Sequence, residues 1–70
     1  MENIKIETEY ITLGQFLKAA DLISTGGMAK WFLSEYEVFI NGVQDQRRGR
    51  KLRQGDKVEI KGINKTFTLI

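Results

Sequence analysis

The sequence predicts an α+β fold in which two helices pack on one face of a small, mainly antiparallel sheet. Residues 12–36 carry apolar positions at helical spacing, and residues 37–70 carry short β-branched and alternating runs separated by turns rich in Gly and Asn. A further alternating run lies near the amino end. The chain has 70 residues, of which 41% are hydrophobic and 29% charged, so we expect one globular domain over residues 1–70 with a thin core.

The first helix is predicted to begin after Thr12. Thr12 and Gln15 have the spacing of a capping box, and Ile11 and Phe16 have the spacing of a hydrophobic staple. Apolar residues then recur on one side of the helix, which we expect to face the core. These residues are Leu13, Phe16, Leu17 and Ala20.

The second helix is predicted to begin near Gly27, where the side chain of Ser24 or Thr25 can accept hydrogen bonds from the first amides. Gly26 and Gly27 have two interpretations. They permit a tight turn because Gly tolerates positive φ, or they leave bare amides that a phosphate can approach closely. The buried stripe of this helix is expected to comprise Met28, Ala29, Phe32, Leu33 and Tyr36.

The strands are marked by alternation and by turn residues. Residues 3–7 have the period of a half-buried strand, and Asn41-Gly42 within a β-branched run predicts a hairpin. Gly55-Asp56 forms a turn into another strand, and the turn at residues 61–65 precedes a last strand with Phe67 and Leu69 on one side. The residues assigned to the core alone are Leu13, Phe16, Phe32, Leu33, Val38, Ile40, Val58 and Ile60.

Positive charge is concentrated in the segment Arg47–Arg53. Five of its seven residues are basic and none is acidic, so of the 11 basic residues of the chain six remain elsewhere, against 9 acidic ones. A solvated loop is one interpretation. Because an Arg fork matches phosphate oxygens two at a time, we favour binding to nucleic acid.

Several classes of function are disfavoured by composition. Without His or Cys the chain lacks an imidazole base, a thiolate nucleophile and a conventional zinc or haem site, and its carboxylates are dispersed. No phosphate-binding loop of the G-x-x-x-x-G-K-[ST] type occurs. We therefore expect no catalysis, no cofactor, no metal and no small-molecule substrate. No apolar run reaches the roughly 20 residues of a membrane span, and the acidic amino end is unlike a secretory signal, so we expect a cytoplasmic protein.

The order of these features resembles the RNA-binding domain of ribosomal protein S-four type, also called the αL motif. The resemblance covers about residues 12–60 and rests on "LGQFLKAADLISTGGMAKWFL", "VFINGV" and "KLRQGDKVEI". It implies a stand-alone, small bacterial member of a family that binds structured RNA, commonly ribosomal RNA, through its two helices and the adjoining hairpin loop. Gly26-Gly27 stands where the family has Ser-Arg, and Leu13-Gly14 replaces a basic residue at the first helix, which shifts the predicted contacts toward the Arg47–Arg53 segment.

The predicted RNA-binding residues combine the start of the second helix with the basic segment. Lys30 matches a basic position of the family. Trp31 has two interpretations, of which we favour the first: covering the edge of a thin core, or stacking on an unpaired base. The full set is Thr25, Gly26, Gly27, Lys30, Trp31, Arg47, Arg48, Arg50, Lys51 and Arg53.

The leading hypothesis is a monomeric, non-catalytic module that binds structured RNA, with ribosomal RNA or a ribosomal particle as partner, in translation or ribosome assembly. It predicts that the five cations form one cradle beside the start of the second helix. One alternative is a DNA-binding helix-turn-helix, although Lys30 would be the only cation on its second helix. Another is a protein-interaction adaptor that uses Trp31 and an exposed strand edge at Thr66–Ile70.

Overall fold

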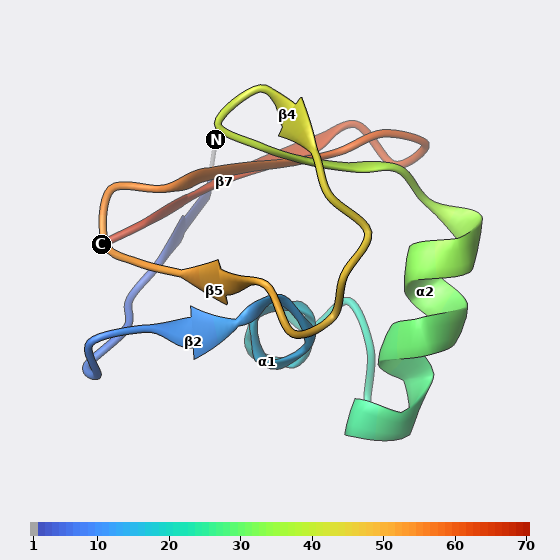
Figure 1. Ribbon diagram of the computed structural model, residues 1–70, viewed down its shortest axis with the longest axis horizontal. Coiled ribbons are helices and arrows are strands. Elements are labelled where there is room, and N and C mark those ends of the chain that lie inside the picture. The colour runs from blue at the N-terminus through green and yellow to red at the C-terminus, as the bar shows by residue number, and fades with distance from the viewer. Residues whose placement is uncertain (1) are drawn as a thin grey trace.

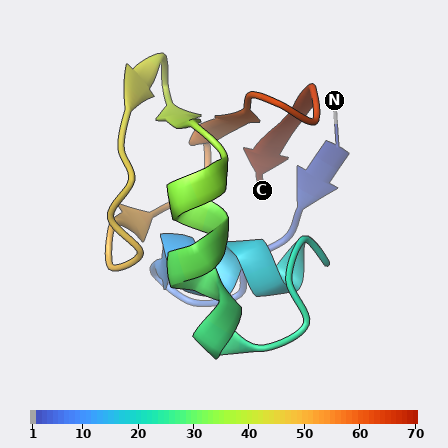
Figure 2. The ribbon, with the colours of Figure 1, turned by 90° about the vertical axis from the view of Figure 1, so that its right-hand side faces the viewer.

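The two helices lie on the same side of a five-stranded sheet, as predicted (Figure 1). The computed structural model describes residues 2–70. Helix α1 (Leu13–Ala19) is seen end-on in Figure 1, with α2 (Ala29–Glu35) standing upright beside it; Figure 2 shows α1 lying across the foot of α2. Within residues 2–70, neither helix is long and apolar enough to cross a bilayer.

The main sheet has the strand order β1-β7-β6-β3-β4. All its neighbours are antiparallel except β1 and β7, which run parallel. Its strands are β1 (Glu2–Ile4), β3 (Val38–Ile40), β4 (Val43–Gln44), β6 (Lys57–Ile60) and β7 (Lys65–Leu69). Strand β7 is therefore paired on both sides, so the exposed edge proposed for a protein-interaction adaptor at Thr66–Ile70 is wrong.

A second, two-stranded sheet pairs β2 (Ile11–Thr12) with β5 (Lys51–Leu52) and was not predicted. Each strand has only two residues, too few to show alternation. Strand β5 lies inside the basic segment, and Leu52 within it is completely buried. The basic segment is thus tied into the core and is not a free loop.

The start of α1 agrees with the sequence. The Thr12 side chain accepts a hydrogen bond from Gln15 N at 3.2 Å, and the Gln15 side chain accepts one from Thr12 N at 2.8 Å, which completes the predicted capping box. Leu13, Phe16 and Leu17 are fully buried, and the Phe16 ring meets Phe67 of β7 edge-on at 5.2 Å.

The start of the second helix differs from the prediction. It begins with a 3₁₀ turn, η1 (Gly26–Met28), and neither Ser24 nor Thr25 provides a side-chain cap. Main-chain carbonyls bind the amides instead: Met28 N donates to Thr25 O, and Ala29 N to Gly26 O. Gly26 and Gly27 do not have positive φ, so the turn does not need glycine there.

The core agrees with the sequence at every residue assigned to it, since all eight are buried. It also takes in residues from the less regular segments. The residues from these segments are Ile6, Ile23 and Leu52. The core is completed by Leu17 and Ala29 of the helices and by Phe67 and Leu69 of β7.

The turns agree with the sequence as well. Asn41 and Gly42 have φ of 52° and 85°, and they join β3 to β4 in the predicted hairpin. Gly62 has φ of 102° in the turn between β6 and β7, where Tyr36 packs directly against it.

Gly62→Ala is expected to destabilise the protein by about 1–3 kcal/mol. The added Cβ would lie 2.8 Å from Cδ1 of Tyr36, in a backbone conformation that L residues avoid. Urea unfolding of both proteins measures the difference. Gly49→Ala is the matched control, because Gly49 has open space around it and no positive φ, and its change should stay within about 0.5 kcal/mol. Equal stabilities for the two variants would contradict this account of the turn.

Candidate nucleic-acid interface

The basic segment is fixed by its main chain to the start of α1. Leu13 N donates to Arg50 O at 2.7 Å, and Gly14 N donates to Arg48 O at 2.8 Å. These are the first two amides of the helix, which have no partner inside it. Arg50 N donates to Arg47 O at 3.1 Å and closes a tight turn. The carbonyls of the segment therefore cap α1 while its side chains project outward.

Gln46 fixes the other end of the same segment to the end of α2. Its Nε2 donates to Leu33 O at 2.8 Å and to Tyr36 O at 2.9 Å, and its Oε1 accepts from Val38 N at 2.8 Å. The segment thus runs from the end of one helix to the start of the other. Sequence reasoning missed Gln46, because a lone Gln beside a charged run carries no periodic signal.

Gly14 lets α1, α2 and the basic segment approach one another. A Cβ at this position would lie 3.4 Å from Arg48 O and 3.7 Å from the Cβ of Ala29.

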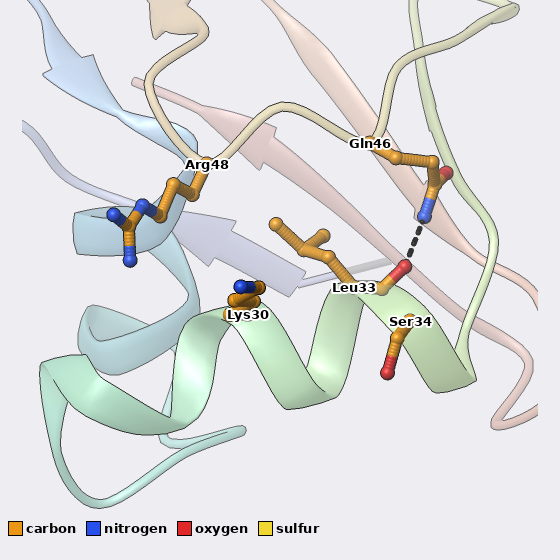
Figure 3. Close-up of a pocket in the computed structure, with 5 residues that line it drawn as sticks. All are labelled: Lys30, Leu33, Ser34, Gln46 and Arg48. Atoms are coloured by element: carbon orange, nitrogen blue, oxygen red, sulfur yellow. Dashed lines mark hydrogen bonds between the residues drawn. The ribbon is translucent and has the colours of Figure 1, made fainter.

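Arg48 and Lys30 face a common hollow of about 370 Å³ between the basic segment and α2. Figure 3 shows Arg48 on the basic segment with its guanidinium in front of α1, Lys30 on the first turn of α2, and Leu33 between the segment and α2. Both cations are exposed, and within residues 2–70 neither forms an ion pair with a carboxylate. Their charges are therefore available to an anion.

Arg47 and Arg50 are held by Asp45. Arg47 donates Nε and one terminal nitrogen to the two carboxylate oxygens at 3.0 and 2.7 Å, and Arg50 Nε lies 3.3 Å from the same carboxylate. The hydrogen bond from Arg47 lowers the pKa of Asp45 to about 2, against the opposing effect of burial. Sequence reasoning considered the segment from Arg47 onward and so missed this carboxylate two residues earlier.

Lys51 and Arg53 lie on a third group, the ring of Tyr10. Lys51 Nζ is 4.9 Å and Arg53 Cζ is 5.8 Å from the ring centroid. The five cations of the basic segment thus form three groups: Arg48 shares a hollow with Lys30, Arg47 and Arg50 contact Asp45, and Lys51 and Arg53 lie over Tyr10. The prediction of a single cradle is therefore wrong. The reason is the main chain, which turns at residues 47–50 and then enters β5, so neighbouring side chains point in different directions.

The remaining predicted residues lie at the start and on the outer side of α2. Thr25, Gly26 and Gly27 are exposed, and no heavy atom approaches a Cβ position at Gly26 within 4 Å. Trp31 is 52% exposed and meets the rings of Phe32 and Tyr36 edge-on, so it lies outside the buried core. The favoured interpretation, that Trp31 covers the edge of the core, is therefore only partly correct. The Trp31 ring contacts Phe32 and Tyr36, but about half of the residue stays exposed.

Two helices packed on a small sheet, with a basic segment capping the first helix, define a class of small domain. Residues 4–68 match the family model of the S4 domain, so the chain belongs to the S4 domain family. It is also similar to the probable ribosome maturation protein RlbA of Bacillus subtilis (strain 168). The two are 70% identical over 60 residues, which cover 86% of this chain and 84% of that protein.

Asp45→Asn is expected to lower stability by about 1 kcal/mol at neutral pH, a value reduced for solvent screening because the Arg47 side chain is 76% exposed. The folded-state pKa of Asp45 lies below its ordinary value of 3.8, so the ionised carboxylate stabilises the fold above about pH 4. This contribution disappears as the pH falls toward 2. Thermal unfolding between pH 2 and 7 should therefore show the two proteins converging in acid. Glu35→Gln removes an exposed carboxylate and is the control; a difference for Asp45→Asn that stays constant with pH would contradict the assignment.

Gln46→Ala is expected to cost about 1–3 kcal/mol, because it leaves the Val38 amide and two helix-end carbonyls without their partner. Urea unfolding gives the stability, and hydrogen exchange should show faster exchange at the Val38 amide. Gln44→Ala, on the exposed edge strand β4, is the matched control. It removes only a long hydrogen bond of 3.4 Å to Gln46 Oε1 and should change stability by less than about 0.5 kcal/mol. Equal losses in the two variants would show that Gln46 does not hold the segment.

Proposed function

We propose that the protein is a non-catalytic RNA-binding module that recognises structured ribosomal RNA during ribosome maturation. The observation that carries this proposal is the pair Arg48 and Lys30, two exposed cations without a carboxylate partner in residues 2–70, held on separate elements around one hollow. Membership of the S4 domain family supports RNA as the ligand, and the name of the Bacillus relative supports the ribosome as the setting.

The mechanism is the binding of RNA phosphates by a preorganised pair of cations. The Arg48 main chain is fixed by its carbonyl bond to Gly14 N, and Lys30 lies on the first turn of α2. The planar guanidinium accommodates two phosphate oxygens at once, whereas the ammonium of Lys30 acts as a point charge. Little backbone order is lost on binding, because both elements are already fixed.

Neighbouring residues extend the contact. The exposed amides around Gly26 and Gly27 lie at the start of the same helix, and Trp31 offers a ring on which an unpaired base can stack. Arg47 joins when a phosphate replaces Asp45 as its partner. No arrangement of side chains suited to reading base edges accompanies these groups, so the proposed selectivity is for RNA shape rather than sequence.

A DNA-binding helix-turn-helix is less well supported. Its recognition helix would be α2, which has seven residues and a single cation, Lys30. A monomer acting in the cytoplasm completes the proposal.

Replacing Lys30 and Arg48 together with Gln is expected to weaken binding to hairpin fragments of ribosomal RNA by at least about tenfold. Loss of two phosphate contacts should also reduce the slope of log K against log salt by about 1.5–2. Fluorescence titration at several salt concentrations measures both quantities. Lys18→Gln with Lys57→Gln is the matched control, since it removes the same charge from two exposed lysines that, within residues 2–70, form no ion pair and lie over no aromatic ring.

The proposal fails if the unmodified protein shows no salt-dependent binding to these fragments. It also fails if the control variant loses as much affinity as the Lys30 and Arg48 variant, or if duplex DNA competes as well as structured RNA.

A further inference from the structure

Lys51 and Arg53 occupy the outer side of the small β2–β5 sheet. Leu52 lies between them and is completely buried, whereas Lys51 and Arg53 are both exposed. Tyr10, just before β2, is 39% exposed and lies beneath both cations. An exposed tyrosine at this place adds little to the core, but it gives two long basic side chains a surface to rest on.

Lys51 and Arg53 lie over an aromatic ring, whereas Arg47 and Arg50 contact a carboxylate. A carboxylate holds a cation and also cancels its charge, whereas an aromatic ring attracts a cation through its quadrupole and leaves the charge in place. Within residues 2–70 the side chains of Lys51 and Arg53 form no ion pair. The nearby Asp56 carboxylate accepts its bond from the main-chain amide of Arg53 and not from the guanidinium.

We propose that Tyr10, Lys51 and Arg53 form a second phosphate-binding platform, distinct from Arg48 and Lys30, that binds another stretch of the same RNA backbone. The proposal rests on the proposed function, since it extends the RNA contact. Tyr10 is a positioning residue, and Lys51 and Arg53 provide the charge.

The two platforms are rigidly linked. Arg48 is tied to α1 through Gly14 N, and Lys51 is paired with Thr12, which is the N-cap residue of the same helix. A rigid pair of contacts favours an RNA whose folded backbone presents phosphates at both places together. A single free phosphate can occupy only one of them and gains nothing from the other.

The test compares six proteins, including the Lys30 and Arg48 variant described above, by titration with one labelled hairpin of ribosomal RNA, from roughly 50 to 300 mM salt. Lys51→Gln with Arg53→Gln should reduce the slope of log K against log salt by about 1.5–2 relative to the unmodified protein. Tyr10→Leu keeps both charges but removes the ring, so affinity should fall about twofold to fivefold with most of the slope retained. Tyr10→Phe keeps the ring and should bind like the unmodified protein.

The control is again Lys18→Gln with Lys57→Gln, because neither lysine lies over an aromatic ring, and thermal unfolding verifies that each variant is folded. The platform is wrong if the Lys51 and Arg53 variant behaves like this control, or if Tyr10→Leu binds as well as Tyr10→Phe. If the Lys30 and Arg48 variant loses affinity for the hairpin while the Lys51 and Arg53 variant does not, the platform alone is rejected and the proposed function stands. Absence of salt-dependent binding by the unmodified protein rejects both.

Discussion

The hydrogen bonds at the start of α1 determine where the basic segment lies. All four of the first amide groups have partners: Thr12 and Gln15 bind each other's side chains, while Leu13 and Gly14 donate to the carbonyls of Arg50 and Arg48. A helix start normally leaves such amides for solvent or an anion. Here the basic segment satisfies them with its own main chain, so a phosphate has no place at this helix end.

This constraint fixes the directions of the charged side chains. Because the main chain at residues 48 and 50 must face α1, Arg48 is left to line the hollow beside α2, and the chain then enters β5 with Leu52 inward. Residues that are adjacent in sequence consequently enter three electrical environments. One holds an uncompensated cation that lines the same hollow as Lys30, one has two cations that share the single negative charge of Asp45, and one rests on an aromatic ring.

Local chemistry made part of this structure predictable. The capping box and the Asn41-Gly42 hairpin involve residues within a few positions of one another, and both have the predicted form. The apolar stripes of the two helices are buried as predicted except at Ala20, Met28 and Tyr36, which are only partly buried. The 3₁₀ turn, the β2–β5 pairing and the contacts of Gln46 depend on partners far apart or on main-chain carbonyls, which no local pattern reveals. For the same reason the concentration of charge in the basic segment was evident from the sequence, whereas the division of its side chains into groups was not.

The division has a consequence for selectivity under the proposed function. Five uncompensated cations in one place would bind any polyanion, because the counterion-release contribution grows with the number of phosphates neutralised and carries no information about shape. Asp45 removes part of that contribution, while the small net charge of +2 keeps long-range attraction weak. What remains is two phosphate contacts, one at Arg48 and Lys30 and one at Lys51 and Arg53. Their spacing is fixed because both are tied to the start of α1. Affinity then depends on whether an RNA presents its backbone at both contacts, and a difference in fold between two RNAs becomes a difference in binding.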